Sequence, residues 1–176
     1  MKIICINGFP RSGKDLFCCY CQPFCYSYST VDFVKEIAYR CGWDGSKTLE
    51  NRKFLSDLKD LLTKWNDVPL KDIKKKIQIR NCLYENDNDF EPIFFIHVRE
   101  PEELKRLKEE WNVKTLLIRR PSVEYNEHSN HADSEVLNFN YDYIIDNIGT
   151  KEDLKKIANN FIIKVRKENW KSKLED

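Results

Sequence analysis

Three residues near the start of the chain have the spacing of a loop that binds phosphate. Gly8, Gly13 and Lys14 fit the pattern G-x-x-x-x-G-K, and an apolar run precedes them. The glycines allow backbone angles that turn N–H groups toward an anion, and the lysine adds a mobile positive charge. Asp15 stands where serine or threonine ordinarily follows the lysine and binds magnesium. The pattern predicts a polyphosphate site with an altered metal ligand.

Other charged residues indicate what could happen to the bound phosphate. Phosphoryl transfer depends on positioning and on neutralising charge, so it requires arginines and a magnesium ligand. The candidate arginines lie in the loop or near the ends of expected elements, and they are Arg11, Arg52, Arg99, Arg119 and Arg120. Asp15 is the expected magnesium ligand, and Asp32 is a candidate for orienting or deprotonating an acceptor. These residues predict an ATP-dependent phosphotransferase that uses Mg²⁺.

Each of these charged residues also has a purely structural interpretation. Arg52 would then be a solvated residue on an amphipathic helix. Arg119 and Arg120 would form salt bridges at a strand end, and Asn147 would cap the turn before the last helix. A histidine such as His97 is more typical of a hydrogen-bonded core residue than of a metal ligand.

Elements that could position these residues follow from the apolar patterns. Strand-like runs occur at 2–7, 92–98, 113–118 and 141–146, with a weaker run at 25–28. Helical patterns separate the runs, and this alternation predicts a mainly parallel sheet. We therefore expect a three-layer α/β/α domain with a five-stranded sheet. Ligands in such folds bind beyond the carboxyl ends of the strands, where the glycine loop falls.

The 176 residues are expected to form a single domain with two additions. Residues 43–90 carry two helical patterns, one over 47–65 and one starting near Pro69, and predict an insertion on the acceptor side. Residues 119–140 are polar and lack periodicity, which predicts a short lid. A closing lid would exclude water, which otherwise competes as acceptor.

Composition argues against several other classes of protein. The net charge is +1, with 30 basic and 29 acidic side chains interspersed, which disfavours a dedicated nucleic-acid or membrane surface. No run approaches the ~20 apolar residues that span a bilayer, and a strand starts at once, leaving no room for a signal peptide. We expect a cytoplasmic monomer or homodimer that acts on small molecules.

Seven cysteines are present, four of them between residues 18 and 25. Cys18, Cys21 and Cys25 fall at helical spacing just after the glycine loop, and no second ligand pair completes a zinc set. We expect these three to pack in the core as small apolar side chains.

With these residues placed, the chain resembles the P-loop deoxynucleoside monophosphate kinases of bacteriophages, within the adenylate-kinase-like group. The most specific likeness is Ser-Gly-Lys-Asp at 12–15 after an arginine, because that family also carries aspartate after the lysine. Further likenesses are the arginine-led helix 52–58, Val98-Arg99 at a strand end, Arg120-Pro121 followed by His131 and Glu135, and the segment 145–150. The resemblance extends over most of the chain.

A role for each candidate residue follows on this interpretation. The donor nucleotide would be held by Gly8, Arg11, Ser12, Gly13, Lys14, Asp15 and Asn147. The acceptor would be bound by Asp32, Arg52 and Arg99. The catalytic groups would be Lys14, Arg99, Arg119, Arg120 and Asp32. Magnesium would be held by Asp15, with Glu100 as the second candidate.

One departure from the family concerns the strand that ends near residue 97. The family carries an acidic residue where this chain has His97. Animal phosphomevalonate kinases share the aspartate after the lysine, so a kinase for a non-nucleotide phosphate ester stays an alternative. A non-catalytic ATP-binding module is a second alternative, which the missing acid would explain. The first prediction is transfer of the γ-phosphoryl of ATP to a phosphorylated acceptor, most simply a (deoxy)nucleoside monophosphate.

Overall fold

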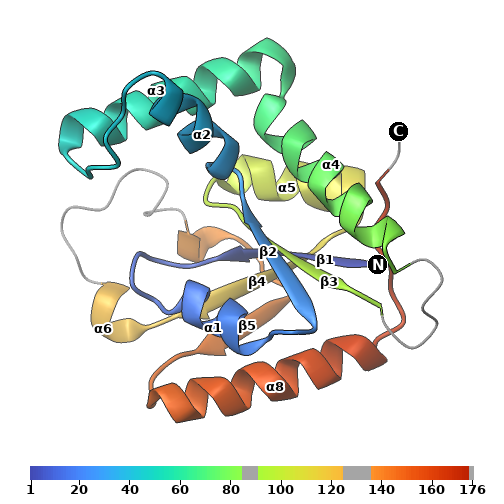
Figure 1. The fold of residues 1–176 in the computed structure, drawn as a ribbon. Helices are drawn as coiled ribbons and strands as arrows, with labels where there is room; N and C mark the ends of the chain where they lie inside the picture. Colours follow the sequence, from blue (N-terminus) through green and yellow to red (C-terminus); the bar gives the residue numbers. More distant parts are fainter. Residues whose placement is uncertain (85–90, 125–135, 175–176) are drawn as a thin grey trace. The chain divides into compact units, whose positions relative to one another are not determined.

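A twisted five-stranded sheet organises the chain in the computed structural model (Figure 1), which describes residues 1–84, 91–124 and 136–174. The strands are β1 (Lys2–Asn7), β2 (Cys25–Ser29), β3 (Ile93–His97), β4 (Lys114–Arg119) and β5 (Tyr143–Asp146). Their order in the sheet is β2-β3-β1-β4-β5. β1 pairs in parallel with both β3 and β4, and β4 pairs in parallel with β5. The predicted α/β fold with a mainly parallel sheet is confirmed.

The strand order places the carboxyl end of β1 where ligands bind in open α/β sheets. β1 lies at the centre of the sheet. β2 and β3 lie on one side of it, and β4 and β5, which come later in the chain, lie on the other. Such a reversal opens a crevice at the carboxyl ends of the strands, where ligands bind in open α/β sheets. The glycine loop leaves β1 at this point.

Contacts divide the chain into two compact units, residues 1–27 with those from 84 onward, and residues 28–83. In the first unit α1 (Lys14–Tyr20) and α8 (Lys151–Lys167) lie on one face of the sheet, and α5 (Pro101–Trp111) lies on the other (Figure 1). This unit therefore has the helix–sheet–helix layers that the alternating pattern predicted.

Aromatic rings fill the core between the sheet and the α1–α8 layer. Phe17 meets Phe95 and Phe161 edge-on, with ring centroids 6.1 Å and 5.6 Å away. The thiols of Cys18, Cys21 and Cys25 are buried beside them, and all three cysteines are free. The expectation that these cysteines pack in the core is confirmed.

Both ends of α8 are capped by side chains. Thr150 and Asp153 form a reciprocal capping box at its start, as their spacing predicts. At its end, the ammonium of Lys2 donates to the carbonyls of Val165 (2.7 Å) and Glu168 (2.8 Å). A buried cation at a helix C-terminus satisfies orphan carbonyls and complements the helix dipole. Lys2 thereby ties the first strand to the last helix.

Replacing Lys2 with methionine should lower the free energy of unfolding by about 2–4 kcal/mol. Methionine keeps the apolar stem but leaves the buried carbonyl of Val165 and the partly buried carbonyl of Glu168 without this donor. Urea denaturation followed by circular dichroism measures the loss. Lys171→Met is the control, because that side chain is 75% exposed and should cost almost nothing. Equal stability of the two variants would contradict the cap.

The second unit is helical, with α2 (Asp32–Arg40), α3 (Leu49–Asn66) and α4 (Val68–Cys82). The two helices predicted within 43–90 are present with nearly the expected bounds, and Thr48 caps α3 by accepting a hydrogen bond from the Asn51 N–H. The apolar side chains that recur at helical spacing along α3, such as Phe54, Leu61 and Trp65, do not form a buried face, since no residue of this helix is buried and Trp65 is 80% exposed. That this unit faces an acceptor stays a prediction.

The segment predicted as a lid is only partly described. Its ends form α6 (Pro121–Glu124) and a short 3-10 turn, η1 (Val136–Asn138), whereas residues 125–135 lie outside the described residues. Lid closure, and the roles of His131 and Glu135 in it, therefore stay predictions. Among the helices of the described ranges, none is long and apolar enough to cross a membrane.

Candidate functional site

The loop between β1 and α1 has a backbone that only particular residues adopt. Gly8 and Gly13 have φ of +145° and +98°, and Arg11 is left-handed at +66°. A Cβ on Gly8 would lie 2.3 Å from the Ile118 carbonyl oxygen, and one on Gly13 would lie 2.5 Å from the Asn147 amide nitrogen. Both glycines of the motif are therefore required by backbone angle and by space.

Side-chain donors bind three of the loop's carbonyl groups. Lys14 Nζ donates to the carbonyls of Gly8 (2.5 Å) and Phe9 (2.9 Å). The Asn147 side-chain amide donates to the carbonyl of Ser12 (2.8 Å). Within the described residues, the backbone N–H groups of Arg11 and Gly13 have no acceptor. With three of its carbonyls bound by side chains and these N–H groups available, the loop is electrostatically suited to an anion.

Asn7 is a site residue that sequence reasoning missed. It is fully buried at the end of β1, where its Oδ1 accepts from the Gly8 N–H at 2.8 Å. Its amide nitrogen donates to the carbonyl of Arg99 (3.2 Å) and to the hydroxyl of Tyr141 (3.0 Å). Burial raises the pKa of Tyr141 to about 12, so this hydroxyl is neutral near pH 7. A polar residue ending an otherwise apolar strand was the available signal.

Asn147 braces the loop from the carboxyl end of β5. Its side chain is 6% exposed and bonds the Ser12 carbonyl, while its backbone N–H donates to the carbonyl of Arg119 at 2.7 Å. The residue was predicted to bind the donor nucleotide. The structure places it against the loop backbone, and direct contact with a nucleotide stays a prediction.

Asn147→Ala should cost about 1–3 kcal/mol of unfolding free energy, because the Ser12 carbonyl would lose its donor. Chemical denaturation measures that loss. The matched control is Asn159→Ala on α8, an exposed position where alanine favours the helix and no loss is expected. If the two variants unfold alike, the amide does not brace the loop.

Arg119 and Arg120 lie at the end of β4 with different surroundings. The guanidinium of Arg119 pairs with both carboxylate oxygens of Asp146, at 2.6 Å and 2.8 Å. This pairing holds the pKa of the Asp146 carboxyl below its usual range. Arg120 is exposed just before α6. The salt-bridge interpretation thus applies to Arg119, and the catalytic roles of both arginines stay predictions.

The end of β3 brings Arg99, Glu100 and His97 to the same edge of the sheet. Arg99 and Glu100 are exposed, and Glu100 is the N-cap residue that precedes α5. The imidazole of His97 contacts the hydroxyl of Ser27 at 2.8 Å and the carboxylate of Asp15 at 3.8 Å. The hydrogen-bonded histidine that the sequence favoured is therefore present, in contact with the predicted magnesium ligand.

Two predicted acceptor-binding residues belong to the second unit. The Asp32 carboxylate accepts from the backbone N–H of Ser29 at 2.8 Å, at the start of α2. Arg52 is exposed on α3. The predicted roles of Asp32 and Arg52 toward an acceptor are not tested by these local contacts, and both stay predictions.

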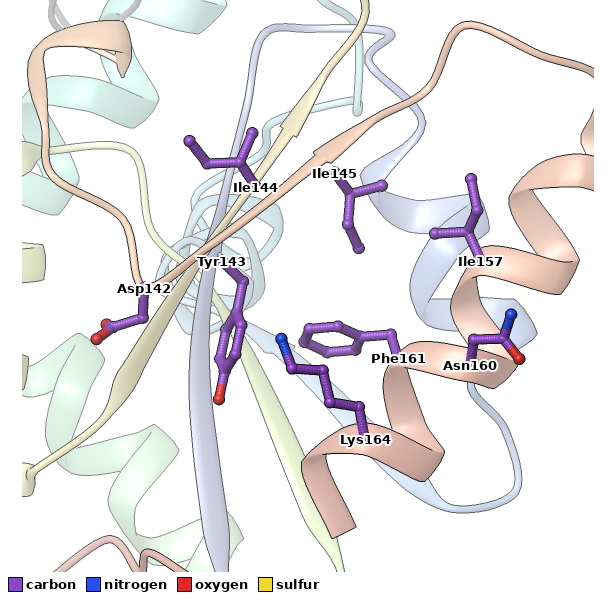
Figure 2. A pocket seen from close by; sticks show the side chains of 8 residues that line it. All are labelled: Asp142, Tyr143, Ile144, Ile145, Ile157, Asn160, Phe161 and Lys164. Atoms are coloured by element: carbon purple, nitrogen blue, oxygen red, sulfur yellow. The ribbon is translucent and has the colours of Figure 1, made fainter. Parts of the chain in front are cut away.

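An open pocket of about 390 Å³ lies elsewhere, between the edge strand β5 and α8 (Figure 2). Its aromatic side chains pack against each other, since the rings of Tyr143 and Phe161 meet edge-on at 5.2 Å. The Lys164 ammonium lies 5.1 Å from the Tyr143 ring centroid, a cation–π contact. No residue of the glycine loop lines this pocket. It is therefore separate from the candidate phosphate site.

Comparison with solved structures shows that the chain is similar to known folds. The chain superposes on a dephospho-CoA kinase from Campylobacter jejuni with a TM-score of 0.50 and 16% identity, covering 93% of this chain and 97% of that one. The two chains share a fold. TT1252 from Thermus thermophilus is similar at 18% identity with the same coverage and a TM-score of 0.41. Neither a protein-family model nor a curated protein sequence matches the chain.

Proposed function

We propose that this protein transfers the γ-phosphoryl group of ATP to a small phosphorylated acceptor, most simply a (deoxy)nucleoside monophosphate. The arrangement of the loop between β1 and α1 carries the proposal. Lys14 and Asn147 bind three of its carbonyls, while the N–H groups of Arg11 and Gly13 have no acceptor in the described part of the chain. The buried Ser12 hydroxyl also lacks a partner there, at a cost of ~1–3 kcal/mol that a seated anion would offset.

The residues present fit magnesium as well as phosphate. Asp15 follows Lys14 in the first turn of α1, and its side chain is 98% exposed. Within the described ranges no cluster of three or more metal-binding side chains occurs, so the protein would offer one or two carboxylates. Magnesium in kinases is held in this way, with phosphate oxygens completing its shell. When bound, the ion neutralises charge on the phosphates. Asp15 is the proposed ligand, and Glu100 the second candidate.

The chain's own residues would supply positioning and positive charge. Lys14 would move from the loop carbonyls to the terminal phosphates of ATP. Arg99, Arg119 and Arg120 would stabilise the charge on the transferring group. We assign acceptor binding to Arg52, Arg99 and Asp32, with Asp32 also orienting or deprotonating the acceptor.

An ADP-release assay across a panel of acceptors tests the proposal. The panel contains nucleoside and deoxynucleoside monophosphates, phosphomevalonate, and dephospho-CoA, which the name of the structural neighbour adds. One acceptor should raise ADP release well above the rate with ATP alone, and ³¹P NMR should show the new phosphorylated product. The identity of that acceptor separates a nucleotide kinase from a kinase of the phosphomevalonate kind.

The alternative of a non-catalytic ATP-binding module is favoured by one observation, the histidine at the position of the expected strand acid. That alternative predicts nucleotide binding without acceptor-dependent turnover. Binding is measured separately as thermal stabilisation, because a ligand at 100 times its dissociation constant adds ~2.7 kcal/mol. If ATP binds and no acceptor raises turnover, the kinase proposal fails and the binding module remains. If ATP does not stabilise the protein, both fail.

A further inference from the structure

His97 occupies a junction between three elements of the first unit. It ends β3, and its Nε2 lies 2.8 Å from the Ser27 hydroxyl on β2 and 3.8 Å from the Cys18 sulfur on α1. Its other ring nitrogen, Nδ1, lies 3.8 Å from a carboxylate oxygen of Asp15. The imidazole is 17% exposed, whereas the Asp15 side chain is 98% exposed. The His97 ring is thus largely buried and hydrogen-bonded, and it lies next to an Asp15 carboxylate that faces solvent.

The contacts favour one tautomer of the histidine. If Nε2 carried the proton, the lone pair of Nδ1 would face the negative Asp15 carboxylate, which is unfavourable. With the proton on Nδ1, Nε2 accepts from the Ser27 hydroxyl, and Nδ1–H points toward Asp15. Cys18 does not disturb this arrangement, because burial raises the pKa of its thiol to about 12 and keeps it neutral.

Neither ring nitrogen is suited to bind the metal itself. Nε2 is occupied by Ser27, and Nδ1 is directed at Asp15. Magnesium also prefers oxygen ligands to imidazole. The imidazole is better suited to orient a metal-binding carboxylate, since such carboxylates are ordinarily hydrogen-bonded by outer-shell partners.

We propose that His97 is a positioning residue for Asp15: it donates from Nδ1 to the carboxylate that holds the metal, and Ser27 fixes the ring for that task. The inference rests on the proposed function, because it needs a nucleotide–metal complex in the loop. The 3.8 Å separation is longer than a hydrogen bond, as is often the case in catalytic sites before the ligands bind, and the proposal requires it to shorten when the metal complex is present. His97 would thereby support the metal site from the place of the strand acid without entering the coordination shell.

The test measures metal affinity rather than turnover. Each variant is loaded with a non-hydrolysable ATP analogue and titrated with Mn²⁺, and bound metal is followed by electron paramagnetic resonance. Ser27→Ala and His97→Leu should each weaken Mn²⁺ binding about tenfold or more. Ser27→Thr keeps the hydroxyl, and His97→Asn keeps a donor near Nδ1, so both should retain most of the affinity. Asp15→Asn should cause the largest loss.

Binding of the analogue without metal provides the second measurement. Ser27→Ala should leave that affinity unchanged, which a general collapse of the loop would not do. Thermal unfolding is recorded for each variant, and the Ser27→Ala and Ser27→Thr pair decides the outcome if His97→Leu fails to fold. Serine-to-alanine is the milder change, because Ser27 is an exposed residue.

The outcomes separate the inference from the proposed function. If Asp15→Asn loses Mn²⁺ while Ser27→Ala and His97→Leu keep wild-type affinity, the inference is overturned and the proposed function stands. Retention of Mn²⁺ by Asp15→Asn overturns the inference as well, since Asp15 would not be the ligand. If the wild-type chain does not bind the analogue at all, the proposed function fails and the inference fails with it.

Discussion

Replacement of Lys14 by methionine should reduce the proposed phosphoryl transfer by about a hundredfold to a thousandfold, the usual effect of removing one preorganised charge-stabilising donor. Methionine approximates the length of the lysine stem but has no ammonium to follow the phosphates. In the structure that ammonium bridges the carbonyls of Gly8 and Phe9, so the charge already lies over the loop. Acceptor-dependent ADP release measures the rate, and calorimetry with the ATP analogue measures binding.

The matched control for Lys14→Met is Lys155→Met on α8. Lys155 is exposed and lies outside the loop, so its loss changes the net charge equally without touching the site. Wild-type turnover is expected for this control. The kinase proposal would be contradicted if Lys14→Met kept wild-type turnover, or if both lysine variants lost activity to the same extent.

Gly8→Ala should lower the free energy of unfolding by about 2–5 kcal/mol, through backbone strain and steric overlap together. At φ +145° an L residue is strained, and the added methyl would lie 2.3 Å from the Ile118 carbonyl oxygen. That oxygen belongs to β4, which is paired with β1 on one side and with β5 on the other, so this strand cannot easily move away. Nucleotide binding should be lost with the loop's conformation. Urea denaturation and analogue calorimetry measure the two effects.

Gly42→Ala separates the two contributions. Gly42 has φ of +93°, yet a Cβ there would meet nothing within 4 Å. Only the backbone penalty of about 1–2 kcal/mol is expected at this position. The difference between the two variants is then the steric part. Equal losses would show that the close approach of Gly8 to β4 contributes nothing.

Much of the fold was predictable because its signals are local. The apolar runs placed all five strands to within two residues at each end, and their alternation with helices indicated a parallel sheet. The capping box at Thr150 was visible for the same reason, since its two residues are three positions apart. The α3 stripe shows the limit of such patterns. Periodicity places apolar residues on one side of a helix, but it does not decide whether anything packs there.

In the candidate site, too, the features that depend on neighbouring residues were predictable, and those that depend on distant residues were not. The spacing of Gly8, Gly13 and Lys14 was sufficient to predict the glycine-bounded loop between β1 and α1, because glycine dihedrals act within a few residues. That this loop binds phosphate stays a prediction. The brace from Asn147 and the pairing of Arg119 with Asp146 join residues 135 and 27 positions apart. Side-chain chemistry alone does not indicate such partners, since each group has many alternatives of similar energy.

By itself, then, the sequence determined the order of strands and helices along the chain, the loop after β1 and the aspartate that follows its lysine. Only the tertiary structure decided which distant groups meet at that loop. Asn7 bonds both the loop and Tyr141, and His97 contacts both Ser27 and Asp15. The physical reason is that backbone preferences are properties of a few neighbouring residues, whereas a buried polar group takes whichever partner the packing of the sheet presents.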